Sequence, residues 1–423
     1  MNAVHNILLS NEDCEKIIAA DKSTTNELVK IIKYEPERIP GKPGYLGEYT
    51  FLDIYFEVAN GSILSQRYFA KSLPYHDQVL TTAVEEWGIF RKETELYCQI
   101  FNQCVRNTNK VIKWSPECFL ARNNLLVMED LTRMGFKTIS FQTTFNEHHI
   151  KLVLDRLAQM HACSFEYEIN RLEGQSIGSL FNELILFETT FTESSGWFMA
   201  GLKGIEKIAL ERNRYAIDPS KKSVIQNRLW DCMKQIFSLA ECTTKFRSVV
   251  VHRDLWFNNI MFKCDCLDAM CEEPKECILI DFQLARYLPP AVDFLCALYL
   301  LTDSEHRKRF EKTHVEYYYA SLQRKLAILG LDGAAILSRE QFEKSLDHYR
   351  LMGFVWTGVL HGFVNFPQGV LDKLHHHDPK TYTRMSMENR DDFILKYYDE
   401  DRYFRERLDD IVTELLQFLF NFS

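Results

Sequence analysis

The sequence lacks an uninterrupted apolar run of the roughly 18 residues that a membrane-spanning helix requires. Its N-terminus, MNAVHNILLSNEDCEKIIAAD, lacks the basic start and the long apolar core of a secretory signal. Basic residues are in deficit, because 50 Lys and Arg against 59 Asp and Glu give a formal net charge of −9, which argues against a nucleic-acid partner. We therefore expect a globular cytoplasmic protein with no membrane span.

The twelve cysteines lack the paired Cys-x-x-Cys spacing that is usual in zinc sites. Because they are spread through a long chain without an export signal, we expect reduced thiols rather than a disulfide framework. Four of them cluster in one segment, at Cys264, Cys266, Cys271 and Cys277. We expect this segment to be a reduced surface hairpin, with a zinc site as the less favoured alternative.

The 423 residues, 46% apolar and 13% aromatic, suffice for two packed lobes. The first third is rich in strand patterns. Two β-type runs, 49–58 and 64–73, are joined through Asn60-Gly61, a pair typical of a hairpin turn. Apolar residues at helical spacing then predict one helix over 83–101.

Two further strands are expected between residues 111 and 131, and from about residue 146 the pattern becomes mostly helical. Four long helical patterns lie at 147–165, 223–240, 311–329 and 406–422. We therefore predict an α+β chain of two lobes. Residues 1–131 form a small antiparallel β-sheet lobe with one helix, and residues 132–423 form a larger, mostly helical lobe.

The segment VVVHRDLWFNNIMFK (249–263) places polar residues between two apolar runs. His252, Asp254 and Asn259, with Asp281 in the downstream ILIDFQLAR, have the spacing of a phosphoryl-transfer loop and its metal-binding aspartate. A carboxylate such as Asp254 would orient an attacking hydroxyl and take its proton. Hard oxygen ligands such as Asn259 and Asp281 suit Mg²⁺. A coincidental polar turn is the alternative. The downstream Asp-Phe favours the phosphoryl-transfer loop over that alternative.

A phosphotransferase of this kind also needs a lysine for the phosphates of ATP and a glutamate to pair with that lysine. Lys71 ends the β-type run RYFAK, and Glu93 falls within the apolar face of the helix expected over 83–101. A carboxylate in an apolar stripe is costly unless it is paired. We therefore predict a Lys71–Glu93 pair, against the alternative of two solvated charges.

Two other segments are candidates for ATP binding by their positions. Gly44 and Gly47, in GKPGYLGEYT, permit a tight turn whose N–H groups would cover phosphates. LLVMEDL, which includes Glu129 and Leu131, lies where the two lobes should join, and its backbone would bond an adenine edge.

Together these motifs resemble the ecdysteroid kinase-like family, which is related to choline kinases and aminoglycoside phosphotransferases of the protein-kinase-like fold. The resemblance spans roughly residues 30–375 and rests on YFAKSLP, FRKETELY, LLVMEDL, LAQMHA, VVVHRDLWFNNIMF, LIDFQLAR and PAVDF. It implies an enzyme that uses ATP and Mg²⁺ to phosphorylate a hydroxyl of a small molecule, with ecdysteroid alcohols as named substrates. By position it makes Asp254 catalytic, Asn259 and Asp281 metal ligands, and Asp293 a support for the loop.

The sequence departs from the family at Arg253, where relatives usually carry Gly. The resulting His-Arg-Asp resembles protein kinases, but Gln283 replaces their Gly and no Ala-Pro-Glu follows. Arg253 would either block part of a pocket or bind an anion, and the sequence does not decide between them. A kinase for a choline-like or aminoglycoside-like alcohol and a non-catalytic nucleotide-binding protein remain alternatives, and the oligomeric state is open.

Aromatic residues recur in HYRLMGFVWTGVLHGFVNFP (348–367), which is either a core helix or one wall of an apolar substrate pocket. Trp256 is close enough in sequence to Asp254 to touch an acceptor. We expect His161 to be a hydrogen-bonded core histidine, and 375–377, a run of three histidines, to lie in a polar loop.

Overall fold

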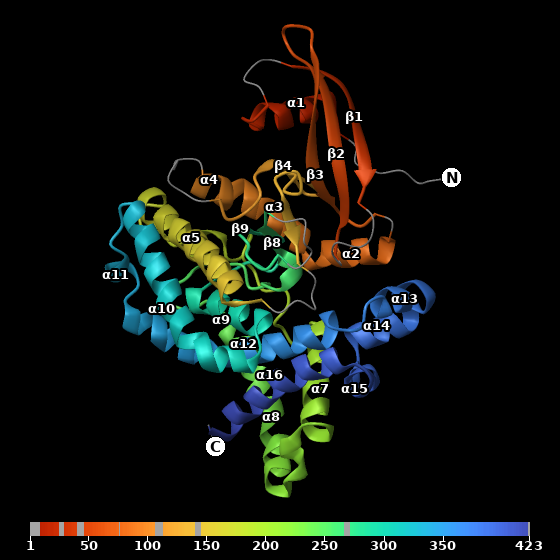
Figure 1. The fold of residues 1–423 in the computed structure, drawn as a ribbon, viewed down its shortest axis with the longest axis vertical. Helices are drawn as coiled ribbons and strands as arrows, with labels where there is room; N and C mark the ends of the chain where they lie inside the picture. The colour runs from red at the N-terminus through yellow and green to blue at the C-terminus, as the bar shows by residue number, and fades with distance from the viewer. Residues whose placement is uncertain are drawn as a thin grey trace.

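The computed structural model describes residues 9–24, 29–39, 46–75, 77–105, 113–139, 145–265 and 271–421. A β-sheet with its helices occupies one end of the molecule, and helices make up most of the rest (Figure 1). This α+β arrangement confirms the predicted fold class. Among the described residues, no helix is both long enough and apolar enough to cross a membrane.

The N-terminal sheet has five antiparallel strands in the order β1-β2-β3-β5-β4. They are β1 (Lys30–Arg38), β2 (Glu48–Glu57), β3 (Ile63–Ser72), β4 (Cys118–Arg122) and β5 (Leu125–Glu129). Leu52, Ile54 and Phe56 on β2 are buried at every second position, which is why this run forms a strand with one face on the core. The β2–β3 turn passes through Gly61, whose φ of +79° suits glycine, as the hairpin prediction required.

The number of helices in this part is larger than predicted. The helical segments are α1 (Asn11–Ala20), α2 (Gln78–Trp87), α3 (Ile89–Glu95), the π-helix η1 (Leu96–Phe101) and α4 (Asn102–Val105). The single helix expected over 83–101 is divided because Gly88 adopts φ +66°, a left-handed conformation that ends α2. Helix α3, which carries Glu93, begins anew after Gly88. Its direction is therefore independent of that of α2.

The C-terminal part contains the four long helices expected from the sequence, α5, α8, α10 and α16. Its helical elements are α5 (Glu147–Arg171), α6 (Ile177–Phe181), α7 (Gly196–Glu211), η2 (Arg214–Ile217), α8 (Pro219–Leu239), η3 (Phe257–Asn259), α9 (Pro290–Leu301), α10 (Ser304–Ile328), α11 (Gly333–Ile336), α12 (Arg339–Val364), α13 (Val370–His377), α14 (Pro379–Met387), α15 (Asp391–Glu400) and α16 (Arg402–Asn421). Helix α9 is buried along its whole length, so it forms the centre of the core.

Two small sheets hold the loops between these helices. One pairs β7 (Val249–Val251) with β10 (Arg286–Leu288), and the other contains β6 (Phe136–Thr138), β8 (Ile260–Lys263) and β9 (Glu276–Leu279). β5 belongs to the N-terminal sheet, whereas β6 pairs with β8. The exact division at residue 131 stays a prediction.

Two expectations about Cys and His segments are wrong. Cys264 and Cys271 form a disulfide, because antiparallel pairing of β8 with β9 brings their Cα atoms to 5.9 Å. Nine other cysteines are free, among them Cys277, and Cys266 lies outside the described residues.

The three histidines at 375–377 end helix α13 rather than lying in a loop, and His375 pairs with Asp77 at 3.2 Å.

Candidate active site

The loop that carries Asp254 is held in place by the buried carboxylate of Asp293. Asp293, in the first turn of α9, accepts hydrogen bonds from the N–H groups of His252 (2.7 Å) and Arg253 (2.6 Å). His161 Nε2 lies 3.1 Å from the same carboxylate, and its Nδ1 lies 2.6 Å from the Tyr318 hydroxyl. Asp293 thus has the supporting position expected for it, and His161 is the expected hydrogen-bonded core histidine.

His252 ties this loop to the strand that leads to Asp281. Its Nε2 donates to the Ile280 carbonyl (2.9 Å), which leaves Nδ1 to accept from the Asp254 N–H (3.3 Å). Burial lowers the pKa of His252, so the ring is neutral at physiological pH, as this pair of bonds requires. A neutral, doubly bonded His252 sets the relative positions of the two acidic residues.

Asp254 is held by the amide that follows it on η3. Asn259 Nδ2 donates both to Asp254 Oδ2 (2.8 Å) and to the Asp254 carbonyl (2.9 Å). Burial, and then the nearby charge of Asp281, raise the pKa of Asp254 to about 7, while Asn259 opposes that rise. A carboxylate with a pKa near neutrality can hold a hydroxyl proton and release it, which is what a general base must do.

Lys71 on β3 joins the two halves of the site. Its Nζ lies 2.5 Å from Glu93 Oε2 on α3 and 3.0 Å from Asp281 Oδ1. Burial by itself would lower the pKa of Lys71, but the charges of Asp281 and Glu93 outweigh it and raise that pKa, so the lysine stays charged. The structure therefore brings together the pair predicted from the sequence and adds a third partner.

The residues after Asp281 complete this network. The Phe282 N–H donates to Glu93 Oε1 (3.0 Å). With its amide oriented to satisfy both neighbours, Gln283 donates to Asp281 Oδ1 (3.1 Å) and accepts from Lys71 Nζ (3.2 Å). Gln283, a departure from the protein-kinase pattern, thus bridges Lys71 and Asp281. Helix α9 begins soon afterwards at Pro290, which leaves no room for a long activation loop.

The chemistry of the donor set fits a magnesium ion. Asn259 uses its NH₂ group for Asp254, so its side-chain carbonyl oxygen is the group that remains for a ligand. Asp281 engages one oxygen with Lys71, and a quarter of its side chain is exposed. An amide oxygen and a carboxylate oxygen are hard donors that Mg²⁺ prefers, together with phosphate oxygens and water.

The residues predicted to contact ATP have mixed outcomes. Gly47 precedes β2 and lines the cavity that contains Asp254, and a Cβ there would lie 3.3 Å from the Ser72 carbonyl. Gly44 lies outside the described residues. The Glu129 N–H donates to the Glu117 carbonyl, and the Leu131 carbonyl accepts from two N–H groups of the following turn. The contacts of Glu129 and Leu131 with an adenine stay predictions.

Arg253 binds an anionic group of the protein itself. Its guanidinium, fully buried, is bonded to both carboxylate oxygens of Glu188 and lies 4.3 Å from the ring centre of Phe191. Burial would raise the pKa of Glu188, but Arg253 and Arg286 outweigh it and hold the pKa at about 2. Arg253 also has φ +70°, a conformation in which glycine is unstrained, which explains why a glycine would fit this position.

Glu188 organises residues 187–197, here called the wall segment. One carboxylate oxygen accepts the N–H groups of Thr189, Thr190 and Phe191 at 2.8–3.0 Å. On the other side, Lys92 of α3 donates to the Phe187 carbonyl (2.7 Å). Arg253, which precedes Asp254, thus fixes the wall segment through Glu188. No local sequence pattern indicated Glu188, because it lies 65 positions from Arg253.

Replacing Glu188 with Gln should lower the free energy of unfolding by about 3–5 kcal/mol, because Arg253 would remain buried without its counter-charge. Denaturant unfolding measures this change. The matched control is Glu193→Gln, whose partner Lys234 is half-exposed, and it should change stability by less than about 1 kcal/mol. Equal effects of the two variants would contradict the assigned role of Glu188.

A cavity of about 530 Å³ opens beside Asp254. Its lining includes the wall-segment residues Thr189, Thr190, Thr192 and Ser194–Trp197, together with Gly47, Tyr49, Trp87, Trp256, Trp356, Leu360 and Phe363. Trp256 lies where the sequence predicted. The 348–367 segment forms a core helix, since Trp356 is 1% exposed, and Trp356 also lines the cavity; that this cavity binds a substrate stays a prediction. Trp356 Nε1 donates to the Arg253 carbonyl (3.0 Å), which connects this wall to the catalytic loop.

This fold and these residues define a small-molecule kinase of the protein-kinase-like class. The sequence profile of the ecdysteroid kinase-like family matches residues 44–331. The chain belongs to that family, which implies a phosphotransferase that uses ATP. Membership also removes the protein-kinase alternative raised by His252-Arg253-Asp254.

Two further comparisons add little. A solved structure of ethanolamine kinase from Plasmodium vivax aligns over 96% of this chain and 93% of that chain, with 13% sequence identity and a TM-score of 0.37. Similarity of that extent supports no conclusion about this chain. No curated protein matches it.

Proposed function

We propose that this protein transfers the γ-phosphoryl group of ATP, with Mg²⁺, to a hydroxyl of a small lipophilic molecule, an ecdysteroid or a hydroxylated xenobiotic. The observation that supports this most is the cavity beside Asp254, whose lining includes four tryptophans, Trp87, Trp197, Trp256 and Trp356, together with leucines and Phe363. Aromatic and aliphatic walls that also carry polar groups to orient the ligand are typical of sites for small, largely hydrophobic molecules. The cytoplasmic location expected from the sequence is part of this proposal.

Some of these residues align the reacting groups, and others stabilise the charge of the phosphates. Asp254 orients the acceptor hydroxyl and takes its proton, while Lys71, held by Glu93, contacts the phosphates. Asn259 and Asp281 would hold Mg²⁺, which supplies positive charge to the phosphates when bound. The wall segment and Trp356 exclude water from the acceptor, which favours transfer to the alcohol over hydrolysis of ATP.

The alternative of a choline-like acceptor predicts an acidic pocket lined by aromatic residues. Among the residues that the structure describes, the acidic ones lining this cavity are Glu48 and Asp254, while Arg38 and His375 also line it. This balance of charge favours a neutral acceptor over a cationic one. A non-catalytic binding protein would have no need of a carboxylate whose pKa lies near neutrality.

The experiment that tests the proposal is a panel of acceptors incubated with ATP and Mg²⁺ and analysed by mass spectrometry. We expect hydroxylated steroids and xenobiotics to gain one phosphate, and their methyl ethers, which lack the reacting hydroxyl, to gain none. Phosphorylation of choline or an aminoglycoside but of no lipophilic alcohol would overturn the proposed substrate class. A thermal shift with Mg-ATP but no product from any alcohol would indicate the non-catalytic alternative.

The pH dependence follows from the pKa of Asp254, which is about 7. A general base acts in its ionised form, so kcat/KM should fall about tenfold per pH unit below pH 7 and level off above it. The measurement is kcat/KM for ATP across pH 5–9, since this ratio reports the free enzyme. A profile that is flat between pH 5 and 7 would contradict the role of Asp254 as the base.

A further inference from the structure

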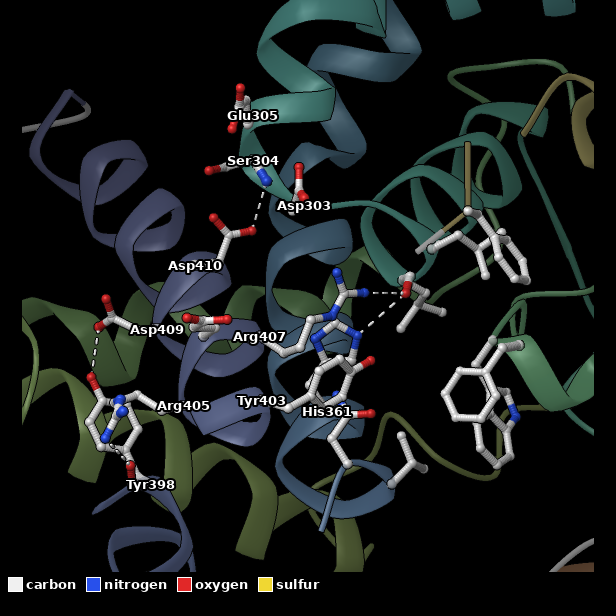
Figure 2. A pocket seen from close by; sticks show the side chains of 18 residues that line it. Asp303, Ser304, Glu305, His361, Tyr398, Tyr403, Arg405, Arg407, Asp409 and Asp410 are labelled. Atoms are coloured by element: carbon white, nitrogen blue, oxygen red, sulfur yellow. Dashed lines mark hydrogen bonds between the residues drawn. The ribbon is translucent and has the colours of Figure 1, made fainter. Parts of the chain in front are cut away.

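A second cavity, of about 600 Å³, borders the first one. It lies between the end of α9, the start of α10, the end of α12 and the first half of α16 (Figure 2). Trp256 and Val364 line both cavities. Trp256 and Phe257, which line the second one, follow Asp254 closely in the chain. The second cavity therefore adjoins the proposed acceptor site without containing Asp254.

The carboxylates at its rim are engaged with other groups. Asp410 accepts from the Ser304 N–H and pairs with Arg307, both at 2.8 Å. Asp409 accepts from the Tyr398 hydroxyl at 3.1 Å (Figure 2). Among the described residues, no group of three or more His, Cys, Asp or Glu side chains suits a metal ion. Asp409 and Asp410 are therefore satisfied within the protein and form no metal site.

Three side chains at the cavity have buried polar atoms with no hydrogen-bond partner in the described structure. They are His361 at Nδ1, Asn365 at both atoms of its amide, and Arg407 at Nε. His361 is 5% exposed and Asn365 is 2% exposed, and Asn365, the C-cap of α12, lies one turn after His361. Buried polar atoms without partners cost free energy, so their presence in one cavity calls for a ligand that supplies the partners.

The polarity of these atoms indicates what they bind. Arg407 Nη2 and His361 Nε2 lie 3.0 and 3.4 Å from one carbonyl oxygen, that of Leu300, and Figure 2 shows both directed at it. His361 Nε2 is the ring nitrogen that faces a carbonyl oxygen, and Nδ1 is the one without a partner; with the proton on Nε2, Nδ1 accepts a hydrogen bond. Arg407 Nε is a donor, and Asn365 offers a donor and an acceptor. A hydroxyl group, which both donates and accepts, matches this set.

The charged residues around the second cavity restrict the net charge of a ligand that could bind there. An anion would approach Asp303, Glu305 and the other rim carboxylates, and a cation would meet the guanidinium groups of Arg405 and Arg407. An uncharged molecule avoids both penalties. Tyr403, Trp256 and Phe257 supply apolar faces for its carbon skeleton.

We propose that this cavity is a second binding site, for an uncharged molecule or group that carries several hydroxyls. Two sources share this chemistry. One is a free polyol or sugar. The other is the hydroxylated end of an acceptor whose apolar body fills the first cavity, and this second source rests on the proposed function.

The test is a calorimetric titration of the full chain, without ATP, with glucose, glucosamine and glucuronate, which share one ring and differ in charge. Glycerol and myo-inositol extend the neutral set. We expect at least one neutral polyol to bind with a Kd of about 1 mM or tighter, and the charged sugars to bind at least about tenfold more weakly than glucose. Absence of binding by all three neutral probes, or equal binding by the charged ones, overturns the proposal.

Asn365→Leu provides the variant, because it removes the donor and acceptor at similar volume. We expect it to weaken polyol binding by about tenfold or more and to raise the melting temperature, since it removes a buried unpartnered amide. The control is Asn227→Leu on the exposed face of α8, which should not change binding. A lower melting temperature for Asn365→Leu with unchanged polyol binding would show that the amide is structural, and would overturn the proposal.

Kinetics separate the two sources. A polyol that inhibits competitively against an acceptor from the phosphorylation panel occupies the place of that acceptor's hydroxylated end. A polyol that binds without competing is a separate ligand. Because the titration needs neither ATP nor turnover, a failure of the proposed kinase activity would leave the binding result intact, and the two failures are distinguishable.

Discussion

Asp254→Asn should lower kcat by about 10²–10⁴-fold, the range typical of losing a general base. The substitution keeps the shape of the side chain and an oxygen that accepts from Asn259, but removes the negative charge and the ability to take a proton. Because Lys71, Glu93 and Asp281 are unchanged, affinity for ATP should remain within a few-fold of the wild type. Single-turnover phosphorylation and a nucleotide titration measure the two quantities.

The stability of this variant offers an independent check. Burial raises the pKa of Asp254, so the ionised carboxylate destabilises the folded state above its ordinary pKa. The Asn variant should therefore be at least as stable as the wild type at pH 8. Asp231→Asn, on the exposed surface of α8, serves as the control and should leave both activity and stability unchanged. Full turnover by Asp254→Asn would remove Asp254 from the mechanism.

Lys71→Met should abolish detectable phosphorylation and lower the free energy of unfolding by about 3–5 kcal/mol. The loss of stability arises because Glu93, which is 1% exposed, would remain buried beside Asp281 without a cation. The loss of activity arises because the phosphates would lose their lysine. Denaturant unfolding and the acceptor assay measure these effects.

Adding Glu93→Gln to Lys71→Met separates the two losses. The double variant should recover part of the lost stability, since the uncompensated charge is gone, but it should recover no activity. Lys33→Met is the matched control, because Lys33 pairs with Glu35 on the surface at 2.6 Å, and it should cost less than about 1 kcal/mol. A Lys71→Met protein that is as stable and as active as the wild type would refute the pairing.

Much of the candidate site was predictable because the signals are local. Strand alternation and the Asn60-Gly61 turn depend on neighbouring residues, and they placed Lys71 on the correct strand. The order and spacing of Asp254, Asn259 and Asp281 reflect the ligands that a phosphoryl group and its metal require. Glu93 was found because a carboxylate in an apolar stripe needs a partner.

Other features depended on contacts between distant segments. Local sequence patterns predicted most of the strands and helices, the charged residues expected at the phosphate site and the resemblance to the family. Four other features became visible in the packed chain: Arg253 pairs with Glu188, Gly88 divides a helix, Cys264 bonds to Cys271, and two cavities share Trp256. The physical reason is that periodicity and turn chemistry act over a few residues, whereas the partner of a buried charge and the shape of a cavity depend on how whole elements pack.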